Sequence, residues 1–285
     1  MKVLVTGGGG MLAHTLVPTL RCAGHEVRAL SREELDVTDR VAVDRCLQQE
    51  LPSIVVQCAA YTAVDRAEEE EALAQQVNAE ATGYVADACQ KVGATLVYPS
   101  TDYVFAGLGD RAYGPDDEPG PLNAYGRSKL AGERAAARCS DCLVVRTSWL
   151  YGAGGRNFVD TIRRLAGERN RLEVVDDQTG RPTSTVEFSR AITLLLKIGA
   201  LGTFHAAGGG LPTTWYGFAK EIVAQLGLEA EVEPVSSSRA ARLARRPAHS
   251  VLECSATERM VGRAFPDWRE SLARYLSTGD QFPVL

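Results

Sequence analysis

Two side chains in one short segment have the types and spacing for acid–base chemistry. Tyr125 and Lys129 stand four residues apart, so on a helix they share one face. A free tyrosine, with a pKa of about 10, is a poor acid at neutral pH, but a neighbouring ammonium group stabilises the phenolate and lowers that pKa. We expect Tyr125 to donate a proton and Lys129 to tune it, as the reduction of a ketone requires.

A third side chain fits the same chemistry. Thr101 follows an apolar run that ends at Pro99-Ser100. Its hydroxyl could donate a hydrogen bond to a carbonyl oxygen that gathers negative charge as a hydride arrives. Tyr-x-x-x-Lys alone also occurs on ordinary amphipathic helices with an exposed lysine, and its combination with Thr101 and a glycine-rich turn is what makes it specific.

The glycine-rich turn occupies residues 7–10, directly after an apolar run and before a helical pattern. Gly7 would permit a tight turn, Gly10 would let the backbone approach a pyrophosphate, and Ala13 would let the helix pack close to the strand. Four consecutive glycines could also be a flexible loop. Their position between strand and helix favours a dinucleotide site.

The residues after the second apolar run bear on the choice of cofactor. This run, 26–30, is followed by Ser31-Arg32 rather than by an acidic residue. A carboxylate there would bind the ribose 2′-hydroxyl of NADH, whereas Ser31 and Arg32 could hold the 2′-phosphate of NADPH. Arg32 could equally be a solvated surface residue, so both NADPH and NADH stay open, with NADPH preferred or at least accepted.

The chain supplies the elements to position these residues. Short apolar runs at 2–6, 26–30, 53–57, 94–99 and 142–146 predict buried parallel strands. Helical patterns at 11–22, 41–49, 67–91 and 124–138 lie between them and provide the crossovers that parallel strands need. The fold class is therefore α/β, a doubly wound parallel sheet of the Rossmann type.

The second half of the chain has a looser pattern. Glycine- and proline-containing loops separate helices expected at 186–197 and 214–226. We expect a dinucleotide-binding domain over 1–150 and a smaller substrate-binding lobe over 151–285, which could return a strand or helix to the first domain. The lobe would close a cleft over the carboxyl ends of the strands.

Composition narrows the class of protein. The formal net charge is −5 and charged residues make up 24% of the 285-residue chain, so a nucleic-acid partner is not expected. No apolar run approaches the ~20 residues of a membrane span, and we expect a cytoplasmic protein. The seven cysteines are odd in number and scattered, which favours free thiols; Cys139-x-x-Cys142 has no second pair at zinc-site spacing, so no metal site is expected.

Nine motifs together resemble the dTDP-4-dehydrorhamnose reductase family of extended short-chain dehydrogenases. They span almost the whole chain: TGGGGMLA at 6–13, AAYTAVD at 59–65, STDYVF at 100–105, YGRSKLAGE at 125–133, RTSWLYG at 146–152, VDDQTGRPT at 175–183, GTFH at 202–205, WYGFA at 215–219 and PDWRESL at 266–272.

The resemblance implies an activity and a set of site residues. The activity would be reduction of the C4 ketone of dTDP-4-dehydro-L-rhamnose by NADPH or NADH. Thr101, Asp102 and Trp149 would face the sugar. The residues expected at the cofactor, from the resemblance and the motifs together, are Gly7, Gly10, Met11, Leu12, Ser31, Arg32, Asp36, Val37, Ala59, Ala60, Tyr61, Thr62, Tyr125 and Lys129.

Three alternatives remain within this resemblance. The family includes reductases of other dTDP-4-keto-6-deoxysugars and a non-catalytic NADP-binding regulatory subunit, and the fold includes epimerases and dehydratases. Some members bind magnesium between subunits through glutamates, one of them in the helix after the glycine-rich turn. That helix carries His14-Thr15 here and no acid. The oligomeric state stays open, with a homodimer as one candidate.

Overall fold

A parallel sheet forms the centre of the larger lobe. The computed structural model describes residues 1–240 and 242–278. In the six-stranded sheet the order is β10-β5-β4-β3-β1-β2, and every pair is parallel. The strands are β1 (Lys2–Thr6), β2 (Glu26–Leu30), β3 (Ile54–Gln57), β4 (Thr95–Thr101), β5 (Cys142–Thr147) and β10 (Gly202–His205). The predicted doubly wound α/β fold is confirmed.

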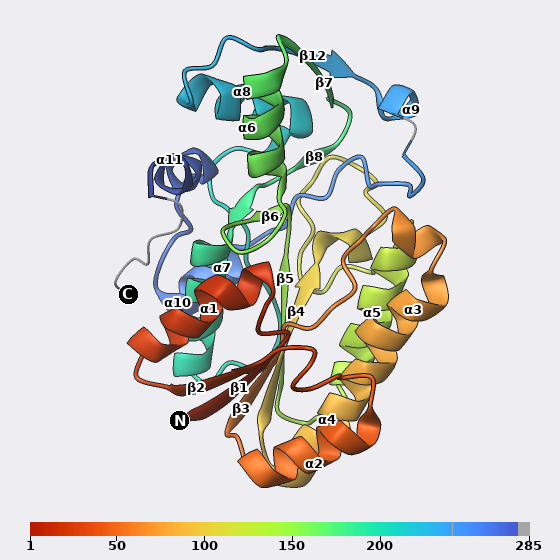
Figure 1. Ribbon diagram of the computed structural model, residues 1–285, viewed down its shortest axis with the longest axis vertical. Helices are drawn as coiled ribbons and strands as arrows, with labels where there is room; N and C mark the ends of the chain where they lie inside the picture. Colours follow the sequence, from red (N-terminus) through yellow and green to blue (C-terminus); the bar gives the residue numbers. More distant parts are fainter. Residues whose placement is uncertain (241, 279–285) are drawn as a thin grey trace.

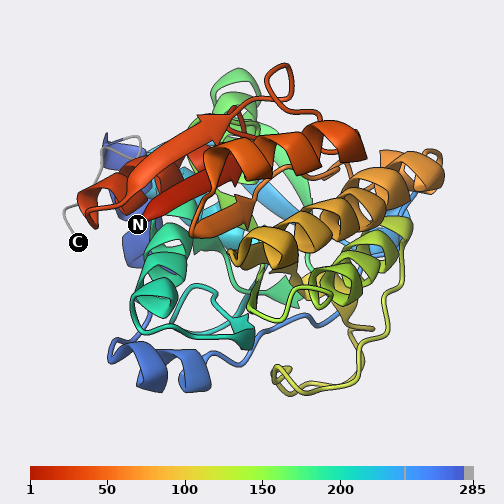
Figure 2. The same ribbon diagram turned by 90° about the horizontal axis from the view of Figure 1, so that it is seen from below.

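Helices cover both faces of this sheet (Figures 1 and 2). One face carries α1 (Met11–Cys22) and α7 (Thr185–Lys197), and the other carries α2 (Arg40–Glu50), α4 (Ala81–Val92) and α5 (Ala124–Ala136). Strands covered on two sides must be apolar along their whole length, and β1, β3 and β5 are buried at nearly every position.

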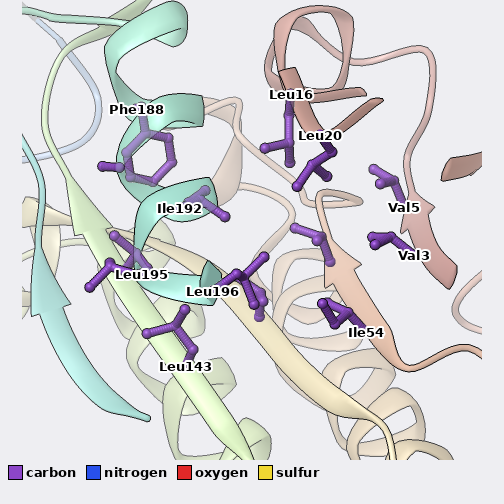
Figure 3. Packing of buried hydrophobic residues seen from close by; sticks show 14 of the residues in the cluster. Val3, Val5, Leu16, Leu20, Ile54, Leu143, Phe188, Ile192, Leu195 and Leu196 are labelled. Atoms are coloured by element: carbon purple, nitrogen blue, oxygen red, sulfur yellow. The ribbon is translucent and has the colours of Figure 1, made fainter. Parts of the chain in front are cut away.

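The core under α1 and α7 is built from long aliphatic side chains (Figure 3). Leu16 and Leu20 of α1 and Ile192 and Leu195 of α7 are fully buried against the strands. Each such side chain stabilises the fold by roughly 1.5–3 kcal/mol relative to an exposed position. The first turn of α1 is thereby fixed above the ends of β1 and β3.

The helical stretch between β3 and β4 differs from the single helix predicted over 67–91. It consists of a 3₁₀ turn η1 (Arg66–Glu68), α3 (Glu71–Gln75), a π-helical turn η2 (Gln76–Glu80) and α4. The π turn contains Asn78, whose side chain bonds to Tyr61 and Ser128 rather than facing solvent. Single π turns inside helices commonly mark functional positions.

The smaller lobe has a core of its own, at the top of Figure 1. Phe218, Trp268 and Leu272 are fully buried in it. Its helices are α6 (Phe158–Glu168), α8 (Trp215–Gln225), α9 (Ser237–Ala240) and α11 (Trp268–Thr278). Its short strands are β6 (Leu150–Tyr151), β7 (Arg171–Val175), β8 (Thr179–Gly180), β9 (Thr183–Ser184), β11 (Thr213–Thr214) and β12 (Glu231–Val235).

The second half of the chain also contributes to the larger lobe. Both α7 and β10 come from beyond residue 150, and α10 (Ser255–Val261) places Val261 against the same core. In the part of the chain that the structure describes, no helix is both long and apolar enough to cross a membrane.

Candidate functional site

Two adjoining hollows lie at the carboxyl ends of the strands. The first, the catalytic cleft, has a volume of about 620 Å³, and the second, the rim groove, about 550 Å³. Both are lined by Gly9, Gly10, Cys58 and Ala60, so they meet at the glycine-rich turn.

Every site residue predicted from the sequence lines one of the two hollows. The catalytic cleft is lined by Gly10, Met11, Leu12, Ala60, Thr62, Thr101, Asp102, Tyr125, Lys129 and Trp149. The rim groove is lined by Gly7, Gly10, Ser31, Arg32, Asp36, Val37, Ala59, Ala60 and Tyr61. Segments far apart in the sequence thus form one continuous surface.

The glycine-rich turn has the backbone that a phosphate cradle needs. Gly7 has a φ of +63°, which favours glycine, and a Cβ there would lie 2.7 Å from the backbone of Ala59. The amide of Gly8 donates to Leu30 O at 2.7 Å, which holds the turn against the end of β2. No neighbouring atom lies within 4 Å of a Cβ built on Gly9, so this side of the turn is open to a ligand.

The rim groove is charged and exposed. The Arg32 side chain is 80% exposed and lies 3.7 Å from the carboxylate of Asp36. Hydrogen bonds from the backbone and hydroxyl of Thr38 lower the pKa of Asp36. Glu33 also lines the groove, so Arg32 has two carboxylates nearby, a feature that the sequence argument left out.

Tyr125 and Lys129 share one face of α5, as predicted. Asn123 caps this helix by accepting a hydrogen bond from the Gly126 amide at 2.7 Å. Tyr103 meets the Tyr125 ring edge-on, with centroids 6.0 Å apart. Both catalytic candidates face the catalytic cleft, because α5 begins beside the end of β4.

The Lys129 ammonium is bound by residues of β4. Its Nζ donates to Pro99 O at 2.8 Å and lies 3.9 Å from the centroid of the Tyr98 ring. Burial lowers the pKa of Lys129 to about 7, although the carboxylate of Glu133 opposes this shift. Burial therefore favours the neutral form of Lys129 more than in a free lysine.

The predicted lowering of the tyrosine pKa is therefore wrong for the ligand-free protein. Burial raises the pKa of Tyr125 to about 12, a hydrogen bond with Thr101 opposes this, and the charge of Asp102 adds to it. The physical reason is that burial disfavours the charged phenolate, and the Lys129 ammonium bonds to Pro99 O. Tyr125 is thus kept protonated, as a proton donor must be.

A buried ion pair supports α5 from below. The guanidinium of Arg146 on β5 donates to Glu133 at 2.9 and 2.7 Å, and Ser100 donates to the same carboxylate at 2.5 Å. Both charged side chains are nearly inaccessible to solvent. Buried charges need such pairing, and here it ties the catalytic helix to the ends of β4 and β5.

Two stacked indoles form the wall of the cleft on the smaller lobe. The Trp149 and Trp215 rings lie 3.7 Å apart and nearly parallel, and both line the cleft. Trp149 adopts a φ of +48°, which is uncommon for a bulky residue and marks a constrained position. A Cβ on Gly180 would lie 2.6 Å from the Trp149 ring, so that glycine makes room for the indole.

Sequence reasoning missed three residues around the site. Asn78 joins the loop at Tyr61 to α5 through Ser128. Because Asn78 stands inside a helical pattern, nothing in the sequence distinguishes it from an ordinary polar residue of a helix. Arg246 pairs with Asp65 at 2.8 Å, and Ser250 donates to Asp102 at 2.5 Å. Both belong to a segment with no regular secondary structure, so no periodicity could reveal them.

The cysteines and the other side chains that could bind a metal ion are scattered over the part of the chain that the structure describes. All seven cysteines are free. Cys139 lies in the connection between α5 and β5, and Cys142 is the first residue of β5. Within residues 1–240 and 242–278, no three His, Cys, Asp or Glu side chains gather as ligands for a metal ion.

The two hollows do fit a dinucleotide. The turn at Gly7 to Gly10 lies at their junction, where a pyrophosphate would approach open backbone. One half would then occupy the rim groove beside Ser31 and Arg32, and the other the catalytic cleft beside Tyr125 and Lys129.

Comparison with known proteins agrees with this geometry. The family model described as "RmlD substrate binding domain" matches residues 1–280. The chain belongs to this family. The resemblance to the dTDP-4-dehydrorhamnose reductases inferred from the motifs is thereby confirmed.

Three relatives show how similar members are. A dTDP-4-dehydrorhamnose reductase of Streptomyces griseus is 43% identical, with 99% of this chain and 93% of the relative covered. A dTDP-4-keto-6-deoxy-D-glucose reductase of Streptomyces niveus is 41% identical over 87% of each chain. The crystal structure of a dTDP-4-dehydrorhamnose reductase from Bacillus anthracis, in complex with NADP, has a TM-score of 0.93 and 38% identity, covering 97% of this chain and 98% of that one.

Proposed function

We propose that this protein is an NAD(P)H-dependent reductase that converts dTDP-4-dehydro-L-rhamnose to dTDP-L-rhamnose. The observation that carries the proposal is the meeting of Thr101, Tyr125 and Lys129 in one cleft with the glycine-rich turn. Relatives that cover nearly the whole chain carry the name dTDP-4-dehydrorhamnose reductase, which supports a dTDP-sugar as the substrate class.

The cofactor would lie across both hollows. The NADP complex of the Bacillus anthracis relative supports NADPH, and Arg32 in the rim groove offers a guanidinium to a 2′-phosphate. Asp36 and Glu33 beside it would suit a 2′-hydroxyl, so NADH is accepted as well. Lys129 would bond the nicotinamide ribose after releasing Pro99 O.

The chain's own residues would then handle the proton and the developing charge. The chemistry that a bound dinucleotide would supply is a hydride for C4 of the sugar. Tyr125 donates its phenolic proton to the C4 oxygen, and Thr101 stabilises the negative charge on that oxygen through a hydrogen bond. Burial of Tyr125 keeps the phenol protonated until that charge develops.

The sugar would lie against the smaller lobe. Trp149, stacked on Trp215, offers an apolar surface to the CH groups of a hexose. Thr101 and Asp102 line the opposite side of the cleft at the end of β4. In this arrangement C4 would lie between Tyr125 and the cofactor.

The test is an analysis of products. The protein is incubated with NADPH and enzymatically generated dTDP-4-dehydro-L-rhamnose, and the sugar nucleotide is identified by NMR. We expect dTDP-L-rhamnose and one equivalent of oxidised cofactor. The other C4 epimer would contradict the proposed product. Turnover only with dTDP-4-keto-6-deoxy-D-glucose would assign the chain to the activity named for the Streptomyces niveus relative.

The same experiment addresses a non-catalytic role. A regulatory subunit would bind NADPH without oxidising it, whereas an epimerase or dehydratase would retain and regenerate NAD. Stoichiometric NADPH oxidation contradicts both. Cofactor binding by calorimetry together with no turnover of either sugar would support the regulatory role.

A further inference from the structure

A chain of hydrogen bonds leads from the C-terminal half of the protein to the reaction centre. Ser250 Oγ donates to Oδ2 of Asp102 at 2.5 Å, and Thr101 Oγ1 donates to Oδ1 of the same carboxylate at 3.1 Å. The amide of Tyr103 donates to Thr101 Oγ1 at 3.2 Å. Asp102 is only 2% exposed and Ser250 likewise 2%, so both carboxylate oxygens are committed to these partners.

The Thr101 hydroxyl has a single proton to donate. While Asp102 is ionised, its carboxylate takes that proton, and Thr101 has none for a carbonyl oxygen in the cleft. If Asp102 instead carries a proton on Oδ1, it donates to Thr101 Oγ1. The Thr101 proton is then free to turn toward the substrate.

Electrostatics at the reaction centre favour the same protonation state. Hydride transfer places negative charge on the ketone oxygen, and a buried carboxylate beside it would repel that charge. Burial raises the pKa of Tyr125 and of Tyr103, and the charge of Asp102 adds to both shifts. Arg246 lies beyond, where it bonds to Asp65 and to Tyr103.

We propose that Asp102 works as a neutral carboxylic acid that donates to Thr101, so that Thr101 can donate to the substrate's carbonyl oxygen, and that Ser250 is the positioning residue of this acid. Both forms of the acid are accessible near neutrality, because burial raises the pKa of Asp102 to about 7 against the opposing bonds from Ser250 and Thr101. The inference rests on the proposed reductase function.

The first test is the pH dependence of kcat/KM for reduction. In the wild type we expect ionisation of Asp102 and loss of the Lys129 proton both to lower activity above about pH 7. In Asp102→Asn the amide Nδ2 donates to Thr101 at every pH. We expect kcat/KM of this variant to fall by no more than about tenfold at pH 6. Above pH 7, its kcat/KM should fall about tenfold less per pH unit than that of the wild type, because one ionisation has been removed.

Ser250 gives a second, milder variant. Ser250→Ala removes a hydrogen bond to the ionised form, so the part of the decline due to Asp102 should move to higher pH by about one unit, while the part due to Lys129 stays. Ser250→Thr should restore the wild-type profile. The matched control is Ser189→Ala, which removes a buried hydroxyl of α7 that lies 3.4 Å from Thr15. It should leave the profile where it is.

Infrared difference spectroscopy measures the acid without turnover. We expect a protonated carboxyl signal in the wild type at pH 6 that is absent in Asp102→Asn and persists to higher pH in Ser250→Ala. An ionised Asp102 at pH 6, or an Asp102→Asn variant with the wild-type pH profile, would overturn the proposal. If no dTDP-4-keto sugar is reduced, the proposed function fails, and the infrared result still decides the state of Asp102.

Discussion

The catalytic cleft and the rim groove share a glycine-rich turn and differ in almost everything else. In the cleft, Lys129 and Asp102 are 3% and 2% exposed and each has defined bonding partners. In the groove, Arg32 is 80% exposed and its ion pair with Asp36 is loose, at 3.7 Å. Burial shifts the pKa of both cleft residues to about 7.

The contrast predicts two different effects of substitutions, one on cofactor affinity and one on the rate of the reaction. Water screens charges on the groove, so a substitution there changes the affinity for one cofactor by a modest factor. Charges in the cleft are desolvated and fixed, so a substitution there changes the barrier of the reaction. The predictions below test this division, and the largest effects belong to the cleft.

Tyr125→Phe should lower turnover by roughly 10²–10⁴-fold, because the phenol is the proton donor. Cofactor affinity, measured by fluorescence titration, should be largely kept. Tyr84→Phe, which alters a tyrosine packed under Arg40 outside both hollows, is the control. Near-normal turnover of Tyr125→Phe would mean that another group supplies the proton.

Lys129→Met should lower turnover by about 10²-fold and yet favour folding at low pH. Burial lowers the pKa of Lys129 from 10.5 to about 7, so the native state binds the proton less well than the unfolded state. The wild type bears this cost fully below pH 7 and loses it as pH rises toward 10.5. In urea denaturation, the advantage of Lys129→Met should be larger at pH 6 than at pH 9.5. An advantage that grows with pH would contradict the assigned burial of the charged form.

Gly180→Ala should raise the KM for the sugar nucleotide by about tenfold, because the new Cβ displaces the Trp149 ring and removes apolar contact with the sugar. The KM for NADPH should stay unchanged. Gly167→Ala, on α6 with no atom within 4 Å of the added carbon, is the matched control. Equal changes in the KM for the sugar nucleotide in the two variants would mean that Trp149 does not contact the sugar.

Arg32→Ala should weaken NADPH by about five- to tenfold and leave NADH unchanged. A charge-assisted bond to a 2′-phosphate is strong when desolvated, and the exposure of Arg32 reduces the effect. Michaelis constants for both cofactors measure it, with Arg45→Ala on the exposed face of α2 as the control. Equal losses of affinity for NADPH and NADH would mean that Arg32 does not bind the 2′-phosphate.

Prolonged EDTA treatment should change activity least of all. The helix after the glycine-rich turn carries His14-Thr15 in place of an acid, and the described residues form no metal-binding group. Rates before and after chelation, with and without added magnesium, are compared. A loss restored by magnesium alone would point to ligands supplied from elsewhere.

The sequence predicted the parts of the fold that local pattern determines. The apolar runs matched five strands to within two residues, and the glycine-rich turn preceded a helix at Met11–Cys22 as expected. The sixth strand, Gly202–His205, was not predicted as a strand. It is a short edge strand that pairs on one side only, with β5, and such pairing leaves little trace in periodicity.

What the sequence could not predict is the bonding between distant segments. The link from Ser250 to Asp102 joins residues 148 positions apart, and the direction of the Lys129 ammonium depends on Pro99 O. The lowered tyrosine pKa assumed a charged lysine beside the phenol. Burial instead lowers the pKa of Lys129 and raises that of Tyr125. The extent of burial depends on the whole packed site and cannot be predicted from the four-residue spacing.

The stacked indoles give the cleft an optical signal of its own. Two parallel chromophores 3.7 Å apart couple their excited states, so Trp149 and Trp215 should produce a paired band in near-ultraviolet circular dichroism. The chain has only one other tryptophan, Trp268, which is buried beneath Arg269. A sugar that settles against Trp149 would alter the coupled band, which makes occupancy of the cleft observable without a label, a cofactor or turnover.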